Sequence, residues 1–102
     1  MAFNGKEGGA ISIEQGADMT ARYRDDNPGD IKGHFYGKDI LKQLLNQEGA
    51  MGIRIYYGID ENGKKELVLV SADADENDNL DLVVDLSQPC PPDCGAANDL
   101  NS

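Results

Sequence analysis

The spacing of hydrophobic residues changes from a helical period to a strand period near residue 50. Before that point, two stretches have helical character, one from about Ile13 to Arg24 and one from about Lys38 to Gln47. Ser12 and Gln15 at the start of the first stretch have the spacing of a capping box. The second stretch carries an apolar stripe made of Ile40, Leu41, Leu44 and Leu45. We therefore expect two helices, the second with the stronger apolar face.

After residue 50, apolar residues alternate with polar ones, as in strands with one buried face. Two such runs span about Ile53–Ile59 and Leu80–Leu86, and a further strand is expected between them at Glu66–Ala72, where the apolar run is continuous. Asn62-Gly63 favours a hairpin between the first two strands along the chain, and a polar turn at residues 73–79 precedes the third. The order predicts an α+β fold, with two helices packed on one face of a three-stranded antiparallel β-meander.

The length of 102 residues suits one domain, which we expect over residues 11–95. We expect a flexible segment at residues 1–10 and a flexible tail at residues 96–102. The middle strand is apolar on both faces, so its second face would be partly bare in a monomer. This face predicts an interaction surface formed by Val68, Val70, Ala72 and the neighbouring Tyr56. A protein partner or a second copy would cover it.

The net charge of −10 is concentrated in the second half of the chain. Residues 1–59 carry eight acids against seven bases, whereas residues 60–102 carry eleven acids against two lysines. Binding to nucleic-acid phosphates needs a basic surface, so that class is excluded, and a basic protein partner is favoured. No apolar run approaches the length of a membrane span, and the N-terminus lacks a secretory signal pattern, so the predicted location is cytoplasmic.

Both cysteines lie in the run Pro89-Cys90-Pro91-Pro92-Asp93-Cys94-Gly95. In extended geometry they would be too far apart for a disulfide, but Pro92-Asp93 suits a turn that closes the gap. Three states of the pair stay open: free thiols, a disulfide, or a metal site. The metal site would need His34, the only histidine, and a carboxylate as additional ligands.

The acidic turn that begins at Asp73 is a second candidate for metal binding. Asp73, Asp75 and Asn77 occupy alternate positions, as the ligands of an EF-hand calcium loop do. However, Asp78 stands where that loop needs glycine, and Val84 stands where it needs a bidentate glutamate. An ordinary polar turn explains the segment better than a cation site does.

No set of residues predicts catalysis. His34 lies beside aromatic residues ahead of a helix, with no nucleophile or orienting carboxylate at a recognisable spacing. We expect Arg54 to stack on the neighbouring tyrosines or to pair with an acid of the third strand. The sequence therefore predicts a protein that is not an enzyme and that holds no cofactor.

Four segments resemble a family of short uncharacterised bacterial proteins found mainly in the Bacteroidetes lineage. They are Lys32–Leu41, Gly52–Gly58, Glu66–Val70 and the terminal Pro-Cys-Pro-Pro-Asp-Cys-Gly. The resemblance covers roughly residues 11–95, and its most distinctive part is the Cys-Pro-Pro-x-Cys ending. It implies no activity and no catalytic residue. It does imply that the cysteines and the turn His34-Phe35-Tyr36-Gly37 serve the fold or a shared interface.

The first functional hypothesis is a small non-enzymatic protein that binds another protein or itself. The second is a metal-binding or redox-responsive protein that uses Cys90 and Cys94. The third is an acidic mimic of nucleic acid that inhibits a DNA-handling enzyme, based on the charge of residues 60–102.

Overall fold

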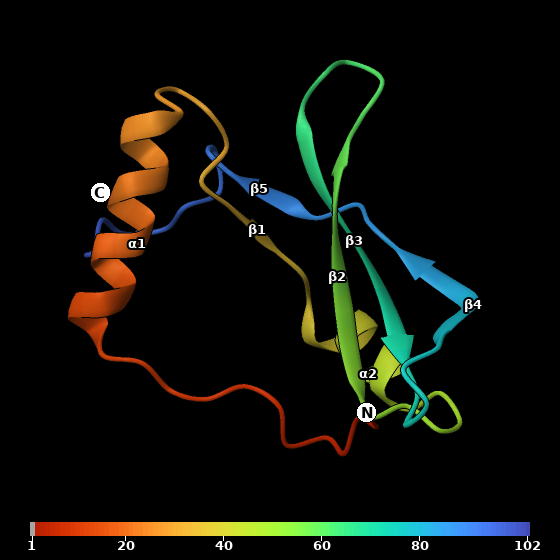
Figure 1. Cartoon of the computed structure of the whole chain (residues 1–102). Coiled ribbons are helices and arrows are strands. Elements are labelled where there is room, and N and C mark those ends of the chain that lie inside the picture. The colour runs from red at the N-terminus through yellow and green to blue at the C-terminus, as the bar shows by residue number, and fades with distance from the viewer. Residues whose placement is uncertain (1) are drawn as a thin grey trace. The chain divides into compact units, whose positions relative to one another are not determined.

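The computed structural model describes residues 2–102, which form two helices and five strands (Figure 1). In chain order these are α1 Ile13–Asp26, β1 Gly33–Phe35, α2 Lys38–Leu45, β2 Gly52–Ile59, β3 Lys65–Ala72, β4 Asp78–Val84 and β5 Gln88–Cys90. The α+β class is confirmed. The contacts divide the chain into two units: residues 2–8 with 36–87 form unit 1, and residues 9–35 with 88–102 form unit 2. The predicted single domain with flexible ends stays a prediction.

Unit 1 contains the expected three-stranded antiparallel sheet, in the order β2-β3-β4. β2 and β3 pair without interruption from Gly52 opposite Ala72 to Ile59 opposite Lys65. The pairing of β3 with β4 shifts register between Leu69 and Ser71. β3 is therefore the central strand, as predicted, and β2 and β4 are the edges.

The third strand begins and ends two residues earlier than predicted. Leu80 and Leu86, which alternation placed on the buried face, are 72% and 93% exposed. The register shift interrupts the alternation of faces, which moves Leu80 away from the core. Leu86 follows the strand and adopts a positive φ of 63°. Of the four residues that alternation placed on the buried face of this strand, only Leu82 and Val84 contribute to the core.

The core of unit 1 is small and joins α2 to the sheet. Leu44 of α2, Leu69 of β3 and Val84 of β4 form a buried cluster. Partly buried side chains pack around it: Tyr36, Ile40, Leu41, Ile53, Leu67 and Leu82. The apolar stripe predicted for the second helix thus supplies one side of the core. α1 belongs to unit 2, so the packing of both helices on one face stays a prediction.

Two polar side chains fix the chain around this core. The hydroxyl of Tyr36 donates to the carbonyl of Leu67 at 2.5 Å, just before α2 begins. Burial, the largest influence, raises the pKa of this Tyr36 hydroxyl. The buried Ser71 donates its hydroxyl to the side-chain oxygen of Gln47 at 2.7 Å. These bonds tie both ends of α2 to β3, and within residues 2–102 every buried side-chain nitrogen and oxygen has a hydrogen-bond partner.

The two hairpin loops of the sheet share one hydrogen-bond pattern. In the first, Asp60 bonds through its backbone to Lys64 and Gly63, and Gly63 has a φ of 81°. In the second, Asp73 bonds in the same way to Asn77 and Glu76, and Glu76 has a φ of 69°. The hairpin predicted at Asn62-Gly63 is confirmed. Both loops place one residue in the left-handed region, which glycine adopts more easily than glutamate does.

Unit 2 contains α1 and a two-stranded sheet that the sequence did not predict. β1 and β5 pair antiparallel, with Gly33 opposite Cys90 and His34 opposite Pro89. Each strand has only three residues, and β5 contains a proline, so neither shows the alternation on which strand prediction depends. α1 begins with the predicted capping box of Ser12 and Gln15.

Candidate interaction surface

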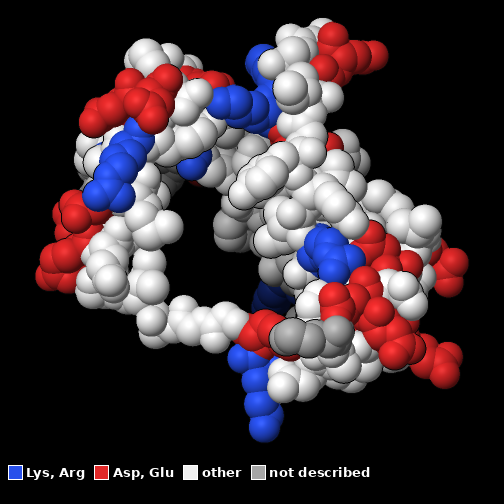
Figure 2. All heavy atoms as spheres, in the orientation of Figure 1, with Lys and Arg blue, Asp and Glu red and all other residues white. Residues whose placement is uncertain are grey.

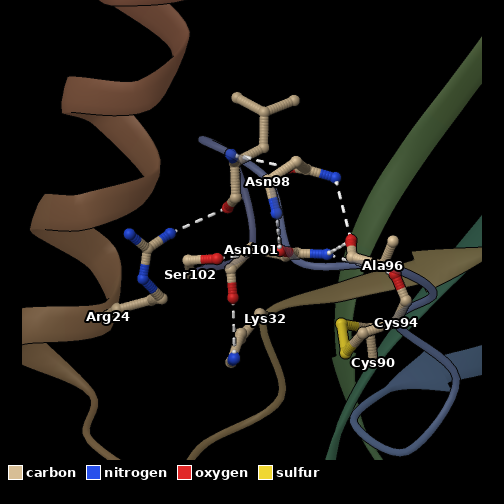
Figure 3. The surroundings of a disulfide bond; sticks show 9 residues. Arg24, Lys32, Cys90, Cys94, Ala96, Asn98, Asn101 and Ser102 are labelled. Atoms are coloured by element: carbon tan, nitrogen blue, oxygen red, sulfur yellow. Dashed lines mark hydrogen bonds between the residues drawn. A yellow bond between two sulfur atoms is a disulfide. The ribbon is translucent and has the colours of Figure 1, made fainter.

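The cysteine pair forms a disulfide at the end of β5 (Figure 3). The two Cα atoms are 4.7 Å apart, so the intervening residues do turn back as expected. The turn is closed by the backbone of Asp93, which donates to the carbonyl of Pro89 at 2.9 Å. Of the three states that the sequence left open, the structure contains the disulfide.

The residues after the disulfide are held by a short network of hydrogen bonds (Figure 3). The side-chain amide of Asn101 donates to the carbonyls of Cys94 and Ala96, each at 3.1 Å. Arg24 of α1 donates to the carbonyl of Leu100 at 2.7 Å, and Lys32 donates to that of Asn101 at 2.9 Å. The disulfide and this network connect the chain end to α1 and to the segment before β1.

The metal hypotheses gain no support from the arrangement of side chains. His34 lies in β1 opposite Pro89, next to the pair of Gly33 and Cys90, so the fold brings it close to the cysteines along the sheet. Yet no group of three His, Cys, Asp or Glu side chains suited to a metal ion occurs within residues 2–102.

The acidic loop after β3 is explained by its own hydrogen bonds. One carboxylate oxygen of Asp73 accepts the backbone N–H groups of Asp75 and Asn77, each at 2.9 Å. The side chain that would be the first ligand of a calcium loop therefore stabilises the turn, as aspartates commonly do. The first loop uses Asp60 in the same way, with the N–H groups of Asn62 and Lys64.

The predicted bare face of β3 is largely covered, so that expectation needs correction. Val70 and Ala72 are only 2% and 3% exposed, and Val68 is half-buried. Arg54 stands opposite Val70, and the Phe3 ring lies 5.3 Å from its guanidinium carbon. Phe3 is itself fixed by a backbone bond to Ala74 at 3.0 Å. The N-terminal residues of the same chain thus contribute to the cover that the sequence analysis assigned to a partner.

A polar cluster completes the cover of this face. Arg54 forms an ion pair with Asp78 at 2.5 Å, and the Tyr56 hydroxyl donates to the same carboxylate. The bond from Tyr56, and after it the bond and charge of Arg54, lower the pKa of Asp78. The bond to Asp78 in turn raises the pKa of Tyr56. The expectation that Arg54 pairs with an acid is confirmed, with Asp78 at the first position of β4.

The opposite face of β2 is open along half of the strand. Ile55, Tyr57 and Ile59 are 54%, 94% and 74% exposed, and they lie opposite Leu69, Leu67 and Lys65 of β3. Their side chains lie on the same face of the sheet as Leu69, which packs against Leu44 of α2. A helix of eight residues is about 12 Å long, whereas a strand of eight residues spans about 27 Å. α2 is therefore too short to cover the whole strand, and Figure 1 shows it near the foot of the hairpin.

The outer edge of β2 is open from Ile55 to Ile59, whereas at the start of the strand residues 51–54 share a hollow with Phe3, Gly5 and Glu7. Within residues 2–102, β2 pairs with β3 and with no second strand. Asp60 and Lys64 form a hydrogen-bonded pair at the hairpin loop. Because hydrogen-bonded and non-hydrogen-bonded pairs alternate in an antiparallel ladder, the odd-numbered positions of β2 direct their backbone groups outward. Those positions are Ile53, Ile55, Tyr57 and Ile59, so the apolar side chains and the unpaired backbone belong to the same residues.

The two edges of the sheet differ in protection. β4 carries Asp81 and the register shift, and Asp85 follows it, all of which discourage strand pairing. β2 has no acid, no proline and no register shift, and its one charge is Arg54, which is paired with Asp78. Figure 2 shows acidic side chains gathered around the foot of the sheet, toward β4 and its preceding loop, with a mostly uncharged surface along the hairpin. We call Ile55, Tyr57, Ile59 and the outer edge of this strand the β2 surface.

The sequence predicts the alternation of these residues but not their exposure. The predicted ranges of the second helix and the first strand already showed that the helix is shorter than the strand. That difference in length would have predicted the exposed residues. Comparison of the chain with protein-family models, curated proteins and solved structures gave no match. None of the helices described within residues 2–102 has the length and apolar character needed to cross a membrane.

Proposed function

We propose that the protein works by binding a protein, which is either another chain or a second copy of itself, through the β2 surface. The observation that carries the proposal is the row of three large apolar side chains on an unpaired edge strand. Clusters of exposed apolar residues on small proteins commonly mark interaction sites. This placement differs from the predicted surface at Val68, Val70 and Ala72, of which two residues are buried.

The mode of binding that suits this surface is addition of a strand to the sheet. An added strand would bond to the outward backbone groups of β2, while its side chains pack beside the exposed row. Backbone bonds supply affinity in this mode, and the alternating side chains supply specificity. The proposal needs no catalytic step and no cofactor.

Site-specific photo-crosslinking in the native cell tests this role. A photoreactive phenylalanine analogue in place of Tyr57 should give a discrete protein adduct, because this side chain is 94% exposed on the β2 surface. The matched control places the same analogue at Leu86, which is 93% exposed in unit 1 but outside the strands. Equal adduct formation at the two positions, or none at Tyr57, would refute the proposal.

A redox-responsive role is the second candidate, and the disulfide favours it over the metal alternative. Structural disulfides are typical of oxidising compartments and uncommon in the cytoplasm, which is where the sequence predicts the protein. Trapping of thiols in intact cells with a maleimide-linked mass tag tests this candidate. A pair that changes between tagged and untagged forms with the redox state of the cell supports it, and a pair that never changes contradicts it.

A further inference from the structure

The β2 surface also indicates what binds there, and this inference rests on the function proposed above. We infer that the occupant is the β2 strand of a second copy. The two strands run antiparallel about a twofold axis at Tyr56 and join two three-stranded sheets into one of six strands. Three features of the strand lead to this pairing: the register of its outward backbone groups, its charge, and the size of its exposed row.

The register follows from which residues direct their backbone outward. An axis at Tyr56 places Ile55 of one copy opposite Tyr57 of the other, and Ile53 opposite Ile59. All four residues have outward backbone groups, and the pair of Ile55 and Tyr57 can form both bonds of a hydrogen-bonded pair. The pair at Ile53 has to fit beside Phe3, Gly5 and Glu7, which share a hollow with Ile53. The pairing of a β-branched residue with an aromatic one is favourable across antiparallel strands.

The same register avoids like charges. It places Arg54 of one copy opposite Gly58 of the other, so the two arginines do not meet. Gly58 has no side chain, which leaves space for the long Arg54 side chain and its bond to Asp78. The two Tyr56 residues face each other across the axis as a non-hydrogen-bonded pair.

Charge distinguishes a second copy from a basic partner. The chain carries a net charge of −10, so copies of it repel one another wherever their acidic residues meet. Residues 52–59 contain no acid, and their single arginine is already paired. A basic partner would be drawn instead to the acids of β4 and its preceding loop, which include Asp73, Asp75 and Asp81. The strand itself brings no carboxylates together; at the ends of the pairing, Asp60 of one copy lies opposite Gly52 of the other, which shares a hollow with Glu7.

The size of the exposed row predicts a weak dimer. Exposed side chains of this size contribute on the order of 100–200 Å² each. A pair of copies would bury on the order of 1,000 Å², at the small end of specific interfaces. We therefore expect association that depends on concentration and becomes weaker when the apolar row is interrupted.

Sedimentation velocity of the untagged protein over a wide concentration range tests the pairing. The expected result is a shift from monomer to dimer as concentration rises. Tyr57→Lys should raise the dissociation constant at least about tenfold, since it places a charge in the centre of the row. Ile59→Lys serves as a second variant, and circular dichroism checks that both are folded. Leu86→Lys, equally exposed but outside β2, should leave the constant unchanged. A monomer at every concentration, or a dimer that neither β2 variant weakens, overturns the inference.

A cysteine placed on the axis tests the register itself. Tyr56→Cys should form a disulfide between copies under mild oxidation, because residues facing each other in a non-hydrogen-bonded pair have Cα atoms about 4.5 Å apart. Ile59→Cys is the matched control, since its counterpart would lie six residues away along the other strand. Equal crosslinking of the two variants contradicts the register.

Failure of the self-pairing can be distinguished from failure of the proposed binding role. If the purified chain stays monomeric and Tyr57 crosslinks to a different protein in the cell, the self-pairing is wrong and the binding role stands. If Tyr57 gives no adduct and the chain stays monomeric, both are wrong.

Discussion

Each of the two units of the chain is stabilised in a different way. Every buried residue among residues 2–102 belongs to unit 1, and these are Leu44, Leu69, Val70, Ser71, Ala72 and Val84. Unit 2 contains a helix, two short strands and the disulfide, but none of its residues is buried. A small segment that cannot bury apolar surface needs another source of stability, and a covalent bond is the usual one. The difference predicts that each unit responds to a different kind of mutation.

Removal of core volume should have the largest effect, and unit 1 should bear it. Leu69→Ala is expected to lower the free energy of unfolding by about 2–5 kcal/mol, because it leaves a cavity between α2 and β4. Urea denaturation followed by circular dichroism measures the loss. Leu86→Ala is the control, with an expected change below about 0.5 kcal/mol since the side chain is 93% exposed.

Amide hydrogen exchange of the same variant shows how separate the units are. Protection should fall in β2 and β3 and persist in α1. Equal loss of protection in α1 would mean that the two units unfold together, and the contrast between them would then be wrong.

Loss of the disulfide should have the second largest effect, confined to unit 2. Replacing both Cys90 and Cys94 with serine is expected to cost about 2 kcal/mol, the entropy of closing a very short loop. The backbone N–H groups of Leu100 and Asn101, which donate to Asn98, should then exchange faster, because they follow the disulfide along the chain. Amide exchange measured residue by residue checks this, with β3 as the internal reference. Faster exchange in β3 would show that the disulfide supports the core as well.

The start of α1 should show a smaller effect, again within unit 2. Ser12→Ala removes the hydroxyl that accepts the N–H of Gln15 at 3.0 Å, and it should cost about 1 kcal/mol. Gln15→Ala is the graded comparison, because it removes the bonds that the Ser12 N–H and hydroxyl donate to the Gln15 side chain but keeps the bond that the hydroxyl accepts. Carbon chemical shifts of the first turn report helicity. If both variants keep full helicity there, the capping box does not hold this end of α1.

The two units also differ in how much of their structure the sequence predicts. In unit 1, the pattern of apolar residues predicted α2, β2 and β3 to within two residues at each end. Burial explains the pattern in α2 and β3, whereas most of the alternating residues of β2 are exposed. In unit 2, the capping box predicted the start of α1, but β1 and β5 left no pattern since nothing in them is buried. The β2 surface was missed because alternation reports which residues share a face. It does not report whether a helix is long enough to cover that face.

The two hairpin loops allow a finer comparison within unit 1. Gly63 and Glu76 occupy the same position of the same turn, with φ values of 81° and 69°. Gly63→Ala should therefore destabilise the protein by about 1 kcal/mol, and Glu76→Gly should stabilise it by about 1 kcal/mol or less. Thermal unfolding of both variants measures the two shifts. Shifts of the same sign would show that the loops are not equivalent.

Acidification should produce the smallest effect, through the cover on the second face of β3. The pKa of Asp78 is lowered by its bonds from Tyr56 and Arg54, so its ionised form stabilises the folded chain. That stabilisation is complete above the ordinary aspartate pKa of about 3.9 and disappears as the pH falls through the lowered value. Asp78→Asn should therefore unfold at lower urea concentration than the native chain at pH 7, and the gap should close below about pH 4. Asp81→Asn, an exposed acid of the same strand, should show no such closure. A gap for Asp78→Asn that stays constant down to about pH 3 would mean that loss of the aspartate shape, and not loss of its charge, causes the effect.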